Sequence, residues 1–442
     1  MASPPPEETP EGVYSILDTD LYKLTMQCCI LKYYPTIDVT YNFTNRTPHK
    51  KFNRKAVDWL QAQIDKLANL FVTKEELDWL HKTCPYLPEA YIAYLGKLRL
   101  QPDSQVELTF HQDPEADRDV GAIHIKVRGK WIETILYEIP LLALISEAYF
   151  KFVDKDWNYD NQVENACEKG RQLIQAGCVF SEFGSRRRRS YKAQELVIHG
   201  LLDAAKEGKE KGWKGKLSGT SNVHFAMRFG LLPIGTVAHE WFMGVAAITD
   251  DYENANEIAL RNWVGTFGTK TLSIALTDTF GTRAFLEGFK KPVDAAVPEI
   301  SYASEFTGVR QDSGDPKDFV KTMESFYKDL GIEGKTMVFS DSLDVEKCLE
   351  YKKVCEEAGF ISSFGVGTFL TNDFHNLSDG KKSVPLNIVI KLGSASGKPA
   401  IKISDNIGKN TGDEAKVAEV KKRLGYVEKN WEEGDETHRW GA

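Results

Sequence analysis

Between Cys178 and Thr368, short apolar runs alternate with stretches of helical character, and this alternation limits the folds open to the chain. Residues 190–207 and 344–359 are the clearest helical stretches. Strands that alternate with helices form βαβ units, in which the strands lie parallel and buried. The apolar runs are CVFSEF (178–183), LSGTSN (217–222), PIGTVAH (233–239), SIALTD (273–278), FTGVRQD (306–312), TMVFSD (336–341) and SSFGVGT (362–368). The pattern therefore predicts an α/β fold with a parallel sheet or a (β/α) barrel.

The segments on either side of this region have a different pattern. Residues 39–47, 105–112 and 121–129 alternate like strands of an antiparallel sheet, and residues 18–34 predict a capped helix. In residues 385–404, two alternating stretches flank a Gly/Ser turn, which predicts a hairpin resembling the first part. The expected divisions are a disordered tail (1–12), an α/β sandwich part (13–150), a barrel (151–380) and C-terminal strands that return to the sandwich (381–442).

Composition excludes several classes of protein. The formal net charge of the 442 residues is −8, whereas a general nucleic-acid binder is usually basic. The most apolar stretch, 139–150, is too short to span a bilayer and contains Glu147. The seven cysteines show no C-x-x-C spacing, which favours reduced thiols in the cytoplasm or the nucleus. We expect neither a nucleic-acid nor a membrane partner.

Polar residues follow each apolar run, at the strand ends where α/β proteins gather their chemistry. These ends read FGSR, GTSN, GTVAHE, TDTFGT, VRQDSGD, FSDSLD and FGVGT. One such loop is an ordinary turn, but seven in series favour a ligand site. Gly-rich turns before helices favour phosphates, Arg186 and Arg310 suit carboxylate or phosphate, and Asp278, Asp312 and Asp341 suit Mg²⁺ or ribose hydroxyls. This set favours a phosphorylated sugar or nucleotide with an anionic partner.

Four consecutive arginines, 186–189, follow a turn at Gly184 and precede a helix predicted to start near Ser190. Successive residues on a turn cannot all point one way. We expect Arg186 in an anion pocket, and Arg187–Arg189 divided among the pocket, its rim and the first turn of the helix. Positive charge at a helix N-terminus opposes the helix dipole, and a bound polyanion would relieve that cost.

The ordered set of motifs resembles the nicotinate phosphoribosyltransferases, in their fungal form, over about 400 residues. These enzymes are type II phosphoribosyltransferases. The matching pieces are ILDTDLYKLTM (16–26), SEFGSRRRRS (181–190), GTSN, IGTVAHEW, LTDTFGT, GVRQDSGDP, SDSLD, FGVGT and PLNIVIKL (385–392). The resemblance implies an irregular (β/α) barrel packed with an α/β sandwich built from both chain ends.

The resemblance also implies a reaction and its partners. Nicotinate and phosphoribosyl pyrophosphate would give nicotinate mononucleotide and pyrophosphate, the entry step of NAD salvage from nicotinic acid. ATP would be a co-substrate, hydrolysed through a transient phosphohistidine, and Mg²⁺ the cofactor. Some relatives are homodimers, and a homodimer is one arrangement open to this chain.

Residue roles follow from the same resemblance. His239 matches the phosphorylated histidine, and Phe183 the aromatic ring that stacks on the pyridine. Tyr22 matches the second face of that stack, which the neighbouring subunit supplies in dimeric relatives. Arg310 matches the arginine beside base and sugar, and Arg186 the one that faces pyrophosphate.

The GTSN loop holds the position that bears on specificity. Related enzymes that use nicotinamide carry Asp where this chain has Ser221, and a carboxylate there would repel nicotinate. Asn222 is a further expected substrate contact. Asp278, Asp312 and Asp341 match acidic positions near ribose and Mg²⁺, with Asp312 and Asp341 as the expected metal ligands. Ser340, Gly365, Gly367 and Thr368 match the loops around the 5′-phosphate, and residues 402–410 are expected to line an ATP-linked face.

Three alternatives stay open on the sequence. The chain could be another type II transferase, using nicotinamide or quinolinate, although Ser221 and the His239–Glu240 pair favour nicotinate. It could be a metal-dependent hydrolase built on His239, Asp278 and Asp312, although the His-x-His ligands common on such barrels are missing. It could bind nucleic acid through the arginine run.

Residues 246–256 resemble the ribose loop of common phosphoribosyltransferases but lack Thr-Gly-Gly-Thr, so we expect helix interior there.

Overall fold

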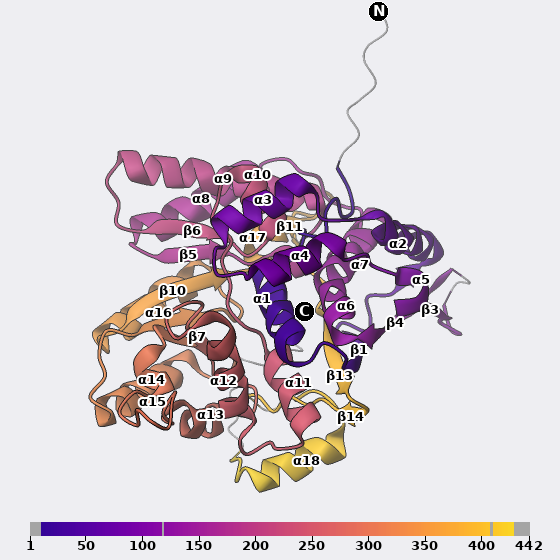
Figure 1. The fold of residues 1–442 in the computed structure, drawn as a ribbon. Helices are drawn as coiled ribbons and strands as arrows, with labels where there is room; N and C mark the ends of the chain where they lie inside the picture. Colours follow the sequence, from indigo (N-terminus) through magenta and orange to yellow (C-terminus); the bar gives the residue numbers. More distant parts are fainter. Residues whose placement is uncertain (1–9, 117–118, 407–409, 428–442) are drawn as a thin grey trace, which may run out of the picture.

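The computed structural model describes residues 10–116, 119–406 and 410–427. It contains two six-stranded sheets, and helices α1 (Leu21–Tyr33), α7 (Glu138–Phe152) and α11 (His239–Thr249) pack between them (Figure 1). Most of the expected tail 1–12, part of the 402–410 segment and the last residues of the C-terminal part lie outside the described residues.

The first sheet is fully parallel and confirms the predicted α/β class. Its strand order is β6-β5-β10-β9-β8-β7. The strands are β5 (Val179–Glu182), β6 (Lys216–Thr220), β7 (Ile274–Leu276), β8 (Gly308–Gln311), β9 (Thr336–Phe339) and β10 (Ile361–Val366). Within the described ranges, β6 and β7 do not pair with each other, so the barrel is irregular.

Of the seven predicted strands, the third, at residues 233–239, is wrong. Pro233 makes one isolated bridge to Thr220, and the rest of the segment forms no ladder before α11 begins at His239. Proline has no N–H for a ladder, which removes a donor at the start of the run. The helix-interior prediction for residues 246–256 is right at both ends and wrong for residues 250–254. Helix α11 ends at Thr249, Asp250 takes a left-handed conformation, and the next helix begins at Ala255.

The second sheet is antiparallel and combines both ends of the chain. Its order is β14-β13-β1-β4-β2, with β3 paired to β4. Strand β1 pairs with β4 on one side and with β13 on the other, which confirms that the C-terminal hairpin returns to the first part. The strands are β1 (Asp38–Asn45), β2 (Phe52–Asn53), β3 (Val106–Gln112), β4 (Val120–Lys130), β13 (Ile388–Ala395) and β14 (Lys398–Pro399). A two-stranded sheet of β11 (Phe374–His375) and β12 (Lys382–Ser383) lies apart.

Helices cover both sheets (Figure 1). Over the sandwich part they are α2 (Arg54–Lys66), α3 (Lys74–Thr83), α4 (Glu89–Lys97), α5 (Pro102–Gln105) and α6 (Trp131–Thr134). Those of the barrel are α8 (Gln162–Gln175), α9 (Tyr191–Glu210), α10 (Val223–Phe229), α12 (Ala255–Phe267), α13 (Thr282–Phe289), α14 (Tyr302–Glu305), α15 (Pro316–Asp329), α16 (Val345–Glu357) and α17 (Thr368–Thr371), and α18 (Glu414–Arg423) follows near the end. None of these helices is both long and apolar enough to cross a membrane.

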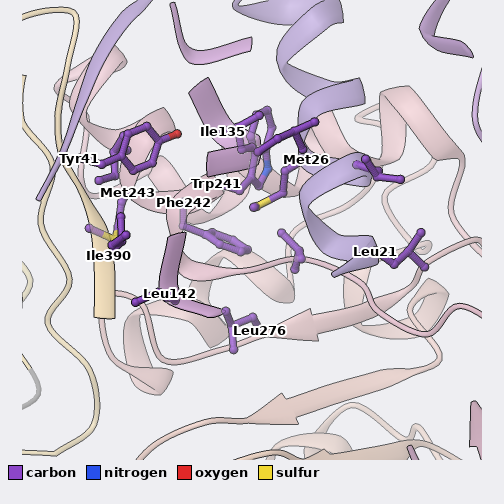
Figure 2. Close-up of a cluster of buried hydrophobic side chains, with 14 of the residues drawn as sticks. Leu21, Met26, Tyr41, Ile135, Leu142, Trp241, Phe242, Met243, Leu276 and Ile390 are labelled. Carbon is purple, nitrogen blue, oxygen red and sulfur yellow. The ribbon is translucent and has the colours of Figure 1, made fainter. Parts of the chain in front are cut away.

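One hydrophobic core joins the two parts. Figure 2 shows Met26 of α1, Tyr41 of β1, Trp241 and Phe242 of α11, and Ile390 of β13 in a single buried cluster. The shared core holds the carboxyl ends of the barrel strands against the sandwich.

Two of the four consecutive arginines, Arg188 and Arg189, are structural. Arg188 is buried and makes two 2.8 Å hydrogen bonds to the carboxylate of Asp18. Arg189 is buried with its guanidinium 3.6 Å from the ring centre of Phe150 and 4.4 Å from that of Phe374. Neither lies at a pocket rim or in the first turn of α9, so that expectation is wrong for both. Asp18, a residue of the fold itself, pairs with the charge of Arg188, whereas we expected a bound polyanion to balance the charge of the run.

Candidate active site

A cavity of about 200 Å³ opens where the carboxyl ends of the barrel strands face the sandwich sheet. It gathers most of the side chains expected from the sequence. Those that line it are Tyr22, Phe183, Arg186, Ser221, His239, Arg310, Asp312, Ser340, Asp341, Gly365, Gly367 and Thr368. Residues more than 300 positions apart therefore meet at one site, and the chain supplies both Tyr22 and Phe183 to it.

Three residues of the cavity wall were not expected from the sequence. Arg46 follows β1, Lys391 lies on β13, and Asp20 precedes α1; all three line the cavity. Lys402, from the 402–410 segment expected to line an ATP-linked face, and Arg187, expected at or near the pocket, line it too. The sequence held one sign of this wall, the lysine Lys391 within the apolar run NIVIKL. Lysine is rarely buried in a strand without a partner, so its position there indicates a charged site.

Two expected residues do not line the cavity. The side-chain amide of Asn222 donates a 2.7 Å hydrogen bond to Asp18, and its carbonyl oxygen accepts one from the backbone of Phe225 at the start of α10. Asn222 thus caps a helix. Asp278 lies behind His239, with one carboxylate oxygen 3.8 Å from His239 Nε2.

His239 is the first residue of α11 and is 16% exposed. Its Nδ1 lies 3.0 Å from Thr279 Oγ1, while Nε2 lies 3.0 Å from Asp312 Oδ2 and 2.9 Å from Lys402 Nζ. Burial and the nearby Lys402 ammonium lower the pKa of His239. Both effects favour the neutral ring, which keeps a lone pair on one nitrogen.

The acids around His239 are ionised. Burial alone would raise the pKa of Asp312, but the His239 hydrogen bond and the charge of Arg310 hold it well below its usual value. The other oxygen of Asp312 accepts a 2.8 Å hydrogen bond from Ser340. Burial would likewise raise the pKa of Asp278, but the charges of Lys402 and His239 and the hydrogen bond from Ser313 together lower that pKa. These contacts fix the histidine between two carboxylates and one ammonium.

Ser221 is paired with an acid that also lines the cavity. Its hydroxyl donates a 2.7 Å hydrogen bond to Asp20 Oδ1, which also accepts one from Ser185 at 2.8 Å. Burial raises the pKa of Asp20. The small Ser221 side chain therefore leaves room beside a carboxyl that takes up a proton more readily than usual.

A buried ion chain connects the helix that carries His239 to Arg186. Glu240, the next residue in α11, contacts the fully buried Lys23 and accepts hydrogen bonds from Tyr41 at 2.6 Å and from Trp131. Lys23 also lies 2.5 Å from Glu138, whose other oxygen lies 3.7 Å from Arg186. The His-Glu motif thus divides in two: His239 faces the cavity, and Glu240 anchors its helix.

The cavity suits anions and a flat ring. Six basic side chains line it, against three acidic ones: Arg46, Arg186, Arg187, Arg310, Lys391 and Lys402, with Asp20, Asp312 and Asp341. Phe183 and Tyr22 provide aromatic surface. A side chain at Gly365 would overlap the Phe183 ring, so this glycine makes space for the aromatic residue as well as lining the cavity.

Metal binding at this site would rest on few protein ligands. In the described part of the chain, no group of three or more His, Cys, Asp or Glu side chains could hold a metal ion. Asp312 and Asp341 both line the cavity, from the ends of the adjacent strands β8 and β9. Two carboxylates suit Mg²⁺, which is usually completed by substrate phosphates and water.

Comparisons with known proteins agree over nearly the whole chain. The profile of the nicotinate phosphoribosyltransferase (NAPRTase) family matches residues 178–428, and that of the NAPRTase N-terminal domain matches residues 17–146. A nicotinate phosphoribosyltransferase from Saccharomyces cerevisiae is 48% identical over 434 residues, which cover 97% of this chain and 99% of that protein.

Solved structures confirm the fold. One from Saccharomyces cerevisiae superposes with a TM-score of 0.90 at 47% identity, covering 95% of this chain and 100% of the other. A nicotinate phosphoribosyltransferase from Porphyromonas gingivalis gives a TM-score of 0.81 at 33% identity, over 93% and 100% of the two chains. The fold is thus the irregular barrel and sandwich of the type II transferases, and this chain belongs to the nicotinate phosphoribosyltransferase family.

Proposed function

We propose that this chain transfers the phosphoribosyl group of phosphoribosyl pyrophosphate to nicotinate, with ATP hydrolysis coupled through phosphorylation of His239. The observation that carries the proposal is a cavity in which six basic side chains surround two aromatic ones. Both substrates are anionic, and one of them is a flat ring.

Transfer of the sugar needs positioning more than a protein nucleophile. The bond from ribose to pyrophosphate breaks through an oxocarbenium-like state, and the pyridine nitrogen takes the sugar carbon. Phe183 and Tyr22 would hold the ring, and Arg186 would meet the departing pyrophosphate. Holding the reactants and the developing charge in fixed positions supplies the rate enhancement.

Selection of nicotinate over nicotinamide would depend on Ser221 and Asp20. Burial raises the pKa of Asp20, and Ser221 and Ser185 donate hydrogen bonds to the oxygen that they share. Ser221 adds no charge, and Arg186 and Arg310 line the same cavity. These features favour the acid over the amide.

The neutral imidazole of His239 supports its role as the phosphoryl acceptor. A lone pair on one nitrogen can attack while a neighbour holds the other nitrogen. Asp312 and Asp341 would hold Mg²⁺ together with substrate phosphates, and bound Mg²⁺ would neutralise charge on the phosphate oxygens.

The direct test is product formation from nicotinate, nicotinamide and quinolinate with labelled phosphoribosyl pyrophosphate, each with and without ATP. We expect nicotinate mononucleotide as the main product and a faster reaction with ATP. Preference for nicotinamide or quinolinate would contradict the proposal. If the protein instead hydrolysed one of these pyridine compounds in the absence of phosphoribosyl pyrophosphate, the result would favour the metal-dependent hydrolase considered above.

The coupling step has its own test. His239→Ala should abolish ATP hydrolysis and ATP stimulation, and a slow ATP-independent transfer should remain. Initial rates of ADP and nicotinate mononucleotide formation measure both effects. A variant that still couples ATP normally would remove His239 from this role.

A further inference from the structure

Glu182, the last residue of β5, is a buried acid that is 1% exposed and does not itself line the cavity. One of its carboxylate oxygens accepts a hydrogen bond from the backbone N–H of Gly184. The other accepts hydrogen bonds from Thr220 Oγ1 at 2.6 Å and from Gln194 Nε2 at 3.0 Å. Three donors thus hold this acid in one position, and no step of the proposed reaction uses it.

The direction of these hydrogen bonds follows from the other partners of the donors. The Thr220 hydroxyl accepts a 3.1 Å hydrogen bond from the backbone N–H of Asn222, which directs its own proton to Glu182. Gln194 Oε1 accepts a 3.1 Å hydrogen bond from Arg188, which turns the Gln194 amide nitrogen towards Glu182. Both oxygens of Glu182 therefore accept and neither donates, an arrangement that a carboxylate can adopt and an amide cannot.

Glu182 joins the two loops that carry the expected contacts to the pyridine ring. Its hydrogen bond to Gly184 closes the turn that holds Phe183. On the neighbouring loop its side chain holds Thr220, and its backbone carbonyl accepts a 2.8 Å hydrogen bond from Ser221. Phe183 and Ser221 both line the cavity. The separation between this aromatic ring and this hydroxyl thus depends on one buried side chain.

We propose that Glu182 is a positioning residue that fixes Phe183 and Ser221 relative to each other and so sets the fit of the pyridine base. This inference rests on the proposed transfer to nicotinate. No bond forms or breaks at Glu182. Its contribution is to hold the two side chains that meet the base, because a bound ring reacts well only in a fixed geometry.

Glu182→Gln tests the proposal, because glutamine keeps the shape but must turn an NH2 group towards a donor. Thr220→Val removes the donor on the neighbouring loop, whereas Thr220→Ser keeps it. Glu147→Gln is the matched control, because Glu147 is also a buried acid that accepts backbone hydrogen bonds, from Gly12 and Tyr191, and it does not line the cavity. The readouts are the KM for nicotinate, the KM for phosphoribosyl pyrophosphate and the melting temperature.

We expect Glu182→Gln and Thr220→Val to raise the KM for nicotinate about tenfold and the KM for phosphoribosyl pyrophosphate by less than about threefold. The displaced ring and hydroxyl weaken contacts to the base more than contacts to the sugar phosphate. Thr220→Ser and Glu147→Gln should keep both KM values near those of wild type. A merely structural role would lower the melting temperature without separating the two KM values.

Two results would overturn this inference alone: unchanged KM values in both Glu182→Gln and Thr220→Val, or equal rises for the two substrates. If Glu182→Gln does not fold, Thr220→Val decides. A wild-type protein that uses another pyridine base would overturn the proposed choice of nicotinate, and the same comparison with that base would still decide the role of Glu182. A wild-type protein without transferase activity would overturn both proposals.

Discussion

Arg186 and Arg189 are three positions apart and serve different purposes. The Arg186 side chain is 47% exposed and lines the cavity, whereas Arg189 is buried among aromatic rings. Arg186→Ala should lower kcat/KM for phosphoribosyl pyrophosphate at least tenfold, because a hydrogen bond to a charged group contributes about 1.5–3 kcal/mol. Its melting temperature should stay near that of wild type. Steady-state kinetics and thermal melting measure the two quantities.

Arg189→Ala provides the contrast. Removing this side chain leaves a cavity between Phe150 and Phe374 and should destabilise the fold by about 2–5 kcal/mol. The activity that remains at low temperature should have a near-normal KM. If Arg189→Ala instead kept its stability and lost substrate affinity, Arg189 would have to contact the ligand.

Ser221 allows a test of substrate choice by a single charge. Ser221→Asp would set a second carboxylate beside Asp20, and kcat/KM for nicotinate should fall at least tenfold. Ser221→Asn has nearly the same size without the charge, so it should lose much less. Equal losses in the two variants would mean that size, and not charge, governs this position.

The residues at the strand ends could be predicted because each follows a recognisable apolar run. Those from the sandwich could not, because Arg46 and Lys391 reach the cavity only through the pairing of β1 with β13. Asn222, in contrast, was expected to contact the substrate but does not line the cavity. An amide in a turn suits a ligand and a helix cap equally well, and only the hydrogen bond that it accepts from the Phe225 backbone identifies it as a cap.

Among the secondary-structure elements, α7 carries a buried acid that joins three segments. The Glu147 carboxyl accepts hydrogen bonds from the backbone N–H groups of Gly12 and of Tyr191 at the start of α9. Burial raises its pKa from the usual 4.5 to about 7. Between these values the folded protein binds more protons than the unfolded chain, so the stabilisation from this group is lost as pH rises towards 7.

Glu147→Gln removes this titration and keeps an acceptor for both N–H groups. From pH 5 to pH 8, the stability of wild type should fall relative to that of Glu147→Gln, by up to about 3 kcal/mol. Melting temperatures of both proteins across this range, at one scan rate, measure the difference. Parallel curves would show that the acid does not titrate in this window.

Element prediction succeeded where pattern and local chemistry agreed. Helix α9 begins at Tyr191 with Ser190 as its cap, as the sequence indicated. At residues 233–239 the apolar pattern indicated a strand, but Pro233 and the approach to α11 prevented one. Pairing between distant strands depends on tertiary packing, so the closure of the barrel could not be deduced from local pattern.

At the scale of the molecule, one close contact lies in the core that barrel and sandwich share. Gly244 of α11 lies against Trp131, and an added methyl group would overlap the ring. Gly244→Ala should therefore destabilise the protein by about 1–3 kcal/mol, although alanine favours helices. Gly288→Ala is the milder comparison, since its nearest atoms would be 3.3 Å away or more, and it should cost less stability than Gly244→Ala. A higher melting temperature for Gly244→Ala would contradict the packing.

The pairing of β1 with β13 also affects how the chain folds during its synthesis. Val39 lies opposite Ala395, so one edge of the sandwich stays open until roughly 350 more residues have been added. At 5–20 residues per second, a ribosome takes on the order of half a minute to supply them. During that interval the nascent chain presents an unpaired strand, which is prone to aggregation. Slow translation or a shortage of chaperones should therefore reduce the yield of this protein before any finished molecule is lost.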